Sequence, residues 1–268
     1  MTSHLEIYAA AALYDLAFSY RDYGREVELL RRAFQDRFER PPARFLEIAA
    51  GPARHALGMA ASGVASTGLD LSTAMADHAR ELARRQGTAL SYVTADMRNF
   101  DLADRFDLAA CMLCSATYLL TDHDFVRHLR SVAACLCADG LYVLELPHPR
   151  DLDGSSTTKD SWTVQSEAGS LDVVWRESAD EIPPATRAIR SCQARLAFTP
   201  QVGPATVIEQ HSFQRVFRRA ELEQLVVASG VFSLDAVWGA LDPTVQLDDA
   251  GAWRMVVVLR ATDRRAAR

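Results

Sequence analysis

A short apolar run that ends in small residues and passes directly into a helical pattern constrains this fold more than any other feature of the chain. Phe45-Leu46-Glu47-Ile48 is followed by Ala49-Ala50-Gly51-Pro52-Ala53, and an alanine-rich helical pattern begins near Arg54. This order predicts a buried strand, a tight turn and the start of a helix. The small side chains at the turn allow the backbone to come close to a ligand.

A second apolar run ends at Asp70, which lies 19 positions beyond Gly51. In βαβ folds, an acidic residue about 20 residues after a tight glycine turn holds the ribose of a nucleoside. The two positions together predict a site for a nucleoside-containing cofactor.

Strands and helices alternate from residue 44 to residue 146. Strands are predicted at 44–49, 65–70, 89–94, 106–113 and 140–146. Helices are predicted at 53–62, 73–86 and 122–137, with Ser72 as the N-cap of the second and Thr121 or Asp122 as the cap of the third. This alternation is typical of a mostly parallel, doubly wound sheet of the α/β class.

The flanking segments follow other patterns. Amphipathic helices are predicted over 4–20 and up to Phe38, where Pro41-Pro42 follow. Short β-rich runs between 150 and 217 predict an antiparallel insertion. A helix at 218–229, ended by Gly230, and strands at 231–238 and 253–260 complete the pattern, with a frayed arginine-rich end at 264–268. We therefore expect four parts: an N-terminal helical cover (1–40), a binding core (41–149), an antiparallel lid (150–217) and a completion of the core sheet (218–268).

Composition narrows the class of protein. The 268 residues are 49% hydrophobic and 24% charged, as in soluble globular proteins, and the formal net charge is −6. We expect no nucleic-acid partner, because no basic run is flanked by aromatics, and no membrane span, because no apolar stretch reaches roughly 18 residues. No signal-peptide pattern opens the sequence and the five cysteines lack a secreted spacing, which indicates a cytoplasmic compartment. Cys111 and Cys114 have C-x-x-C spacing without a second pair, so we expect thiols and no metal.

Four consecutive strand ends carry the candidate binding residues. Gly51 follows the first strand, Asp70 the second, Asp96 the third and Cys114-Ser115 the fourth. In an open parallel sheet these ends meet in one crevice. Their order resembles the class I S-adenosylmethionine-dependent methyltransferases, whose first motif is an acidic residue and a Gly-x-Gly-x-Gly turn. Here Glu47 and Ala49-Ala50-Gly51-Pro52-Ala53 occupy those places.

The resemblance implies a Rossmann-like seven-stranded sheet, S-adenosylmethionine as cofactor and a role for each strand end. Gly51 and Ala49 would approach the methionine part, and Asp70 would accept from both ribose hydroxyls. Asp96 would accept from the adenine amino group, with Met97 against the ring. Leu71 and Cys114 complete the expected cofactor contacts. Glu47 would either bind loop amides near the cofactor or hold the turn.

The N-terminal segment extends the resemblance. Tyr14-Asp15 with Asp22-Tyr23 is similar to the start of amino-sugar and glycine-type N-methyltransferases. The hydroxyls of Tyr14 and Tyr23 are therefore candidates to face the cofactor carboxylate or the acceptor, and Tyr14 is also a candidate catalytic group. The alternative is that both rings only pack the helices. Arg54 is expected on a solvated face, and His55 is expected to be structural.

The motif departs from the family pattern at two positions. Ala49 and Ala53 stand where the family has glycine. Alanine adopts a strongly positive φ only at a cost in free energy. We therefore expect a slightly altered turn around the central Gly51.

A sulfonium methyl group is already activated, so the protein must align a nucleophile and exclude water. An amine attacks with its own lone pair, whereas a hydroxyl needs a base. His148, just past the strand at 140–146, is the candidate base, and its alternative role is to fix a loop. His211 could face the pocket or solvent. Trp162, Trp175 and Phe213 are expected either in the core of the inserted sheet or as an aromatic cradle for the acceptor.

These features predict methyl transfer to an N or O nucleophile of a small molecule in secondary metabolism, by a monomer or homodimer. Two alternatives keep the fold: a non-methylating cyclisation or addition, and a non-catalytic cofactor-binding protein. A nicotinamide dehydrogenase is a further alternative, although the chain lacks its G-x-G-x-x-G spacing.

Overall fold

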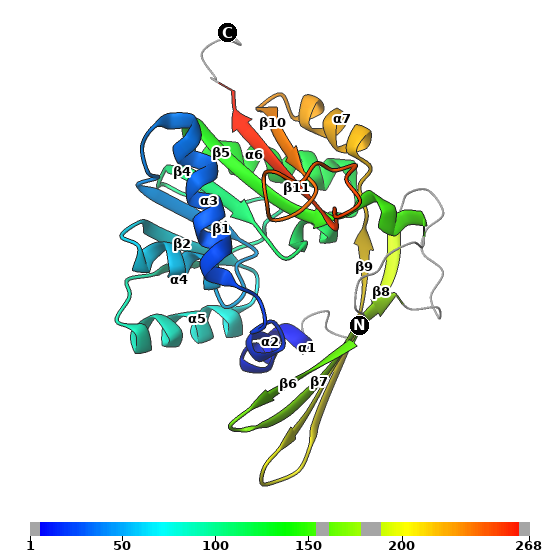
Figure 1. Cartoon of the computed structure of the whole chain (residues 1–268). Helices are drawn as coiled ribbons and strands as arrows, with labels where there is room; N and C mark the ends of the chain where they lie inside the picture. The colour runs from blue at the N-terminus through cyan, green and yellow to red at the C-terminus, as the bar shows by residue number, and fades with distance from the viewer. Residues whose placement is uncertain (1–5, 154–160, 178–188, 263–268) are drawn as a thin grey trace.

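The computed structural model describes residues 6–153, 161–177 and 189–262. The first residues of the predicted 4–20 helix and the predicted frayed end lie outside these ranges. Two sheets organise the described chain, one of seven strands and one of four, with two short N-terminal helices packed against the smaller sheet (Figure 1).

The larger sheet has the strand order β10-β11-β5-β4-β1-β2-β3. Its strands are β1 (Arg44–Ile48), β2 (Ala65–Asp70), β3 (Ser91–Thr94), β4 (Phe106–Cys111), β5 (Leu136–Pro147), β10 (Phe232–Trp238) and β11 (Arg254–Ala261). The strands from β1 to β5 pair in parallel, and β11 pairs antiparallel with both β5 and β10. The predicted doubly wound, mostly parallel sheet of seven strands is confirmed.

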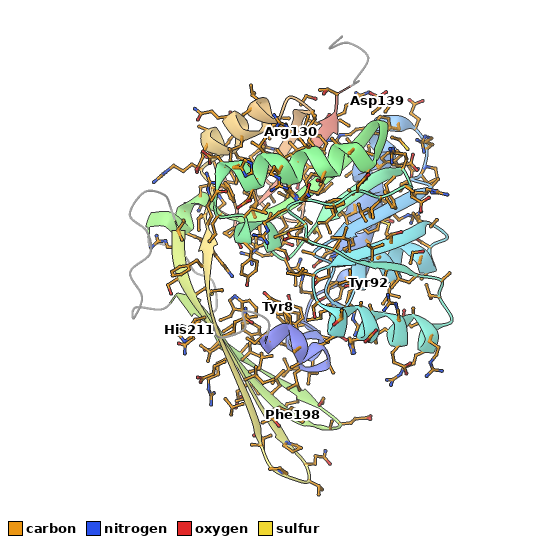
Figure 2. All side chains as sticks on the ribbon, turned by 180° about the vertical axis from the view of Figure 1, so that it is seen from behind. Tyr8, Tyr92, Arg130, Asp139, Phe198 and His211 are labelled. Carbon is orange, nitrogen blue, oxygen red and sulfur yellow. The ribbon has the colours of Figure 1, made fainter. Side chains whose placement is uncertain are left out.

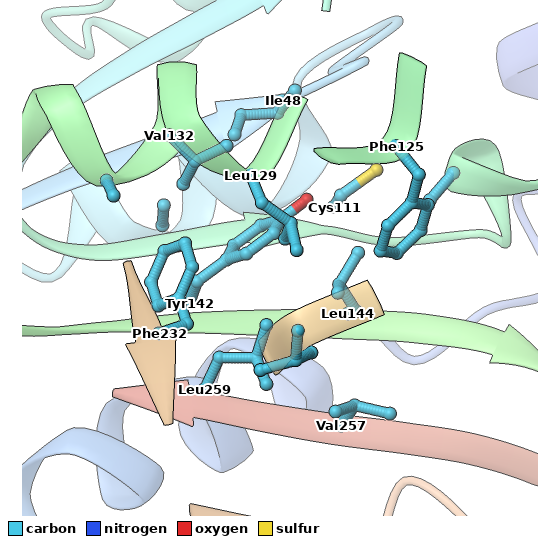
Figure 3. Close-up of a cluster of buried hydrophobic side chains, with 14 of the residues drawn as sticks. Ile48, Cys111, Phe125, Leu129, Val132, Tyr142, Leu144, Phe232, Val257 and Leu259 are labelled. Atoms are coloured by element: carbon cyan, nitrogen blue, oxygen red, sulfur yellow. The ribbon is translucent and has the colours of Figure 1, made fainter. Parts of the chain in front are cut away.

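Helices cover both faces of this sheet. Side chains of α3 (Tyr23–Phe38), α4 (Arg54–Ala61) and α5 (Thr73–Gln86) pack with Phe45 and Leu108 on one face. Side chains of α6 (Asp122–Cys135) and α7 (Arg219–Ser229) pack with Leu46 and Ala109 on the other. Neighbouring strand residues point to opposite faces, so strands buried on both sides are apolar throughout. Figure 3 shows the α6 side, where Phe125, Leu129 and Val132 lie over Tyr142 and Leu144.

The helix ends follow local chemistry. The Ser72 hydroxyl accepts from the Met75 amide at the start of α5, and the Thr121 hydroxyl accepts from the Asp124 amide at the start of α6. Gly230 ends α7 in the left-handed region, at φ +70°. Of the two caps proposed for α6, Thr121 is the one that the structure selects.

The N-terminal helix predicted over 4–20 is wrong as one element. It is two short helices, α1 (Glu6–Ala9) and α2 (Ala11–Ala17), because Ala10 leaves the helical region at φ −91° and ψ 53°. None of the described helices is long and apolar enough to cross a membrane.

The inserted sheet is antiparallel, as predicted. Its strands β6 (Ser161–Ser166), β7 (Gly169–Glu177), β8 (Ile189–Pro200) and β9 (Thr206–Arg215) are paired in sequence order. One face packs Leu171, Val173 and Leu196 against Ile7 and Ala17 of the N-terminal helices. Trp162 and Trp175 belong to this cluster, and the Trp162 indole donates to the Ala17 carbonyl over 2.8 Å. Of the two roles considered for these tryptophans, the structure places both in the core of the insertion.

Candidate cofactor and acceptor site

A cavity of about 410 Å³ lies where the carboxyl ends of the parallel strands face the N-terminal helices and β9. One half is formed by strand ends and the loops that follow them, and the other by α1, α2, β9 and the 3₁₀ helix η1 (Ser115–Tyr118). In Figure 2, Tyr8 lies between the large sheet and the inserted sheet. The cavity is lined by Tyr8, Tyr14, Ala49, Gly51, Leu69, Asp70, Leu71, Ala95, Asp96, Met97, Arg98, Ser115, Tyr118, Leu120, Gln210, Ser212 and Phe213.

The turn after β1 has left-handed backbone angles at three positions, two of which are alanines. Ala49, Gly51 and Ala53 have φ values of 52°, 50° and 56°. Both alanines adopt these strained angles, each at a cost of about 1 kcal/mol. The turn is held by the Tyr92 hydroxyl, which donates to the Gly51 carbonyl over 2.6 Å.

Asp70 is fixed at the cavity wall by backbone amides. One carboxylate oxygen accepts from Gly51 N at 2.9 Å and the other from Ser72 N at 2.8 Å. Burial raises the pKa of Asp70 in spite of these two hydrogen bonds. The Leu71 amide acts on the same carboxylate. A carboxylate has about four acceptor positions, so Asp70 retains capacity to accept from a ligand in the cavity.

Asp96 and Met97 form the next part of the wall. The Arg98 guanidinium binds both oxygens of Asp96, and the Arg98 amide donates to Oδ1 over 2.8 Å. These contacts hold the pKa of Asp96 below its usual value. Asp96 is therefore a carboxylate acceptor at neutral pH and a weak base.

The opposite half of the cavity carries neutral polar groups. The hydroxyls of Tyr8 and Tyr118 lie 2.7 Å apart, and the Gln214 amide donates to the Tyr118 hydroxyl over 3.2 Å. The Gln210 side chain accepts from the Ile7 amide, which joins β9 to α1. Phe213 faces the same cavity, as an aromatic cradle for the acceptor requires.

Tyr14, a candidate from the resemblance of the N-terminal segment, lines the cavity. Burial raises its pKa well above the ordinary value, with Tyr118 adding to the effect. The Tyr14 hydroxyl therefore stays protonated, and it can donate a hydrogen bond but cannot act as a phenolate base.

Tyr23 and Glu47 border a smaller hollow next to the turn, together with Gly51 and Tyr14. The Tyr23 hydroxyl donates to the Phe18 carbonyl over 3.3 Å, and its ring meets the edge of His55. Glu47 is 4% exposed and accepts from the amide of Ala56 and from the His55 ring, each over 2.7 Å. Of the two roles considered for Glu47, these contacts are those that hold the turn.

A buried chain of charges joins the turn to the end of β5. His55 Nε2 donates to Glu26 over 2.7 Å, and Arg21 bridges Glu26 to Glu145, each at 2.9 Å. Burial alone would lower the pKa of His55, but the carboxylates of Glu47 and Glu26 raise it to about 9. Burial would raise the pKa of Glu145, but Arg21 and a further arginine lower it to about 2. That arginine is Arg254, and the Leu113 amide also donates to Glu145.

A second polar cluster ties α2 to the core. Asp15 accepts from Arg54 of α4 over 2.6 Å and lies 2.9 Å from His78 of α5. Burial opposes ionisation of Asp15, but His78 and Arg54 lower its pKa below the usual value. Arg54, expected on a solvated face, thus holds the N-terminal helix over the cavity.

The structure does not bring His148 into the cavity. Its ring is 5% exposed; Nε2 donates to the Leu247 carbonyl over 2.8 Å and Nδ1 accepts from the Arg150 amide over 3.1 Å. Because both ring nitrogens are occupied by backbone groups, the residue fixes the segment before β11 and is not placed to act as a base. His211 is also away from the cavity, since it is exposed on the outer side of β9 (Figure 2).

Three predicted cofactor contacts, Tyr23, Glu47 and Cys114, are absent from the lining of the larger cavity, and Cys114 does not border the smaller hollow either. Cys114 occupies the left-handed region at φ 56° before η1, and its neighbour Ser115 lines the cavity in its place. Burial raises the pKa of the Cys114 thiol to about 12, so it is not a thiolate at neutral pH.

Comparison with known proteins shows what this architecture resembles. Residues 45–140 match the model of a methyltransferase domain. This part of the chain is therefore similar to methyltransferase domains. A methyltransferase from Clostridium acetobutylicum ATCC 824, described as S-adenosylmethionine-dependent, superimposes with a TM-score of 0.74 at 15% identity, over 94% of this chain and 98% of that one. The sugar N-methyltransferase KedS8 from Streptoalloteichus sp. ATCC 53650 superimposes with a TM-score of 0.72 at 22% identity, over 93% of each chain.

A sequence match of higher identity covers half of the chain. The chain is 32% identical over 142 residues to the dTDP-4-amino-2,3,4,6-tetradeoxy-D-glucose N,N-dimethyltransferase of Saccharopolyspora spinosa, which is 50% of this chain and 53% of that protein. The chain spans about half the length of the curated relatives it matches.

Proposed function

We propose that this methyltransferase transfers a methyl group from S-adenosylmethionine to the amino group of a small molecule, with an amino sugar as the substrate class. The cofactor proposal is supported by Asp70, whose carboxylate is held by two backbone amides at the turn, and by Asp96 and Met97 on the neighbouring strand end. When bound, S-adenosylmethionine supplies a methyl group on a positively charged sulfur.

The choice of nitrogen over oxygen depends on one observation: among the described residues, no side chain that lines the acceptor half of the cavity is fit to be a general base. Burial raises the pKa of Tyr8, Tyr14 and Tyr118. His148 and His211 lie outside the lining. A neutral amine needs no base, since its lone pair forms the new N–C bond and its proton leaves to water afterwards.

The acceptor half of the cavity, formed by α1, α2, β9 and η1, fits a small, polar, uncharged ring. The hydroxyls of Tyr8, Tyr118 and Ser115 and the amide of Gln210 supply donors and acceptors, and Phe213 supplies an apolar wall. Such a lining suits a hydroxylated ring that carries an amine. The named sugar N-methyltransferases among the relatives support the same class.

The test is a methyl-transfer assay with the protein, S-adenosylmethionine and dTDP-4-amino-2,3,4,6-tetradeoxy-D-glucose. We expect S-adenosylhomocysteine and an N-methylated sugar in equal amounts at the first turnover, identified by mass spectrometry. A product methylated on oxygen would contradict the proposal that nitrogen is the methylated atom. Conversion of an acceptor without release of S-adenosylhomocysteine would contradict methyl transfer itself.

A further inference from the structure

The buried imidazole of His128 lies directly behind the cavity wall at Met97. His128 is in the middle of α6 and is 0% exposed. Its Nδ1 lies 2.8 Å from the backbone carbonyl of Met97, and Met97 lines the cavity between Asp96 and Arg98. A side chain from another layer of the fold therefore holds the backbone of the wall.

The second ring nitrogen of His128 has a buried partner. Nε2 lies 2.6 Å from the hydroxyl of Tyr142, which is on β5 and is also 0% exposed. In Figure 3, Tyr142 lies under α6 beside Leu129 and Cys111. Because a carbonyl only accepts, Nδ1 carries the proton, and Nε2 accepts from the tyrosine.

The charge state agrees with this arrangement. Burial lowers the pKa of His128 to about 4, so the ring is neutral at physiological pH. A neutral ring with one donor and one acceptor matches a carbonyl on one side and a hydroxyl on the other. The orientation of the ring is thus fixed from both ends, as second partners fix histidines in other sites.

The loop around Met97 has few other anchors. The Ala95 amide donates to the Asp70 carbonyl over 2.9 Å, and the Phe100 amide donates to the Ser131 hydroxyl over 3.2 Å. Between these two points, the contacts of Asp96 and Arg98 are made within the loop itself. The Met97 side chain packs against the core, and His128 adds a hydrogen bond from another layer of the fold to the Met97 carbonyl.

We infer that His128, oriented by Tyr142, is a positioning residue that sets the nucleobase preference of the cofactor site through the Met97 backbone. The inference rests on the proposed cofactor, whose adenine amino group would meet Asp96 and whose ring would lie against Met97. The His128 side chain does not line the cavity. It acts by fixing the position of the Met97 loop relative to β2.

The test compares two ligands, S-adenosylhomocysteine and S-inosylhomocysteine, in which oxygen replaces the adenine amino group. Binding is measured by calorimetry for the wild type, His128→Leu, His128→Asn and Tyr142→Phe. His123→Leu, an exposed position on the same helix, is the matched control. The wild type is expected to prefer the adenine ligand by about tenfold or more, since the hypoxanthine oxygen presents an acceptor, in place of the amino donor, to the Asp96 carboxylate.

His128→Leu is expected to lower the affinity for the adenine ligand by about 5- to 30-fold and the affinity for the hypoxanthine ligand by less than about threefold. The preference for adenine is then largely lost. Tyr142→Phe should give a smaller change of the same kind. His128→Asn should restore most of the preference, because its side-chain amide can donate from the position of Nδ1. His123→Leu should leave both affinities unchanged.

Equal weakening of both ligands by His128→Leu, together with a lower melting temperature, would assign His128 to general stability and overturn the inference. An unchanged preference would overturn it as well. Failure of the wild type to bind either ligand would overturn the cofactor proposal and the inference with it. This outcome is distinguishable from the others because it appears in the wild type, before any substitution is made.

Discussion

The parallel core and the cover above its cavity are held together by different forces. The cover consists of α1, α2 and strands β6 to β9, and its own interior is apolar, around Ile7, Ala17 and Leu171. Its contacts with the core are polar: Asp15 with Arg54 and His78, and Ser72 with the Tyr8 carbonyl. Within the core, helices and sheet meet through buried apolar side chains.

The difference follows from what each boundary must do. Separating two apolar faces exposes them to water, which costs about 25 cal/mol of free energy per Å² of apolar surface. Partly exposed charge pairs exchange their partners for water at a net cost of roughly 0–1 kcal/mol each. We therefore expect the polar boundary to separate at a lower cost in free energy than the apolar contacts within the core.

Substitution of Arg21 should have the largest effect on stability, because Arg21 is a buried charge next to the boundary between cover and core. It lies between α2 and α3 and bridges Glu26 to Glu145, whose side chain is 0% exposed. We expect Arg21→Met to lower the free energy of unfolding by about 3–5 kcal/mol, since it removes the cation that the buried carboxylates of Glu26 and Glu145 share.

Urea denaturation followed by circular dichroism measures this effect. The matched control is Arg32→Met on α3, whose side chain is 71% exposed in a pair with Glu28, and which should change stability by less than about 0.5 kcal/mol. Similar effects of the two substitutions would contradict the importance of the buried chain of charges.

His55 links the stability of the core beside this boundary to pH. Its pKa is raised from 6.5 in the unfolded chain to about 9 in the folded protein by Glu47 and Glu26. The stabilisation is thus complete below pH 6.5 and is lost as the pH rises through 9, by about 3 kcal/mol. Denaturation midpoints in urea at a series of pH values test this, and His55→Gln should remove the decline. A wild-type stability that stays flat from pH 6.5 to 9 would show that the ring is neutral in the folded state.

Substitution of Ala53 tests a smaller effect, the backbone strain in the turn between β1 and α4 of the core. It is buried at φ 56°, directly before α4. Ala53→Gly should raise stability by about 0.5–1 kcal/mol, because relief of the left-handed strain exceeds the added entropy of the unfolded chain. Ala60→Gly, inside α4, is the control and should lower stability by about 0.5–1 kcal/mol. Differential scanning calorimetry measures both, and a loss of stability in Ala53→Gly would show that the turn is unstrained.

The same contrast explains how far the sequence could predict the structure. The strand at 65–70 and the helix at 73–86 match β2 and α5 residue for residue, because periodicity and the Ser72 cap are local signals. The strand-end positions Gly51, Asp70, Asp96 and Met97 line one cavity for the same reason, since parallel strands end at one edge.

The cover could not be predicted in this way. Tyr8, Tyr118 and Gln210 come from three distant parts of the chain, and their meeting depends on how the inserted sheet folds back over the core. His148 has the expected place at the end of β5, but the segment before β11 accepts its hydrogen bond and removes it from the cavity. Neither fact has a local sequence signal, and in the N-terminal helices of the cover only Tyr14 is a candidate site residue, through the resemblance of the N-terminal segment.

Calorimetric titration of the purified protein with S-adenosylhomocysteine, beside Asp70→Ala, is the first measurement to make. We predict micromolar binding to the wild type, a loss of at least about 100-fold in Asp70→Ala, and unchanged binding in Asp77→Ala, an exposed position on α5. NAD should not bind. Absence of binding to the wild type, or equal binding to Asp70→Ala, would contradict the assignment of this cavity to the methyl donor.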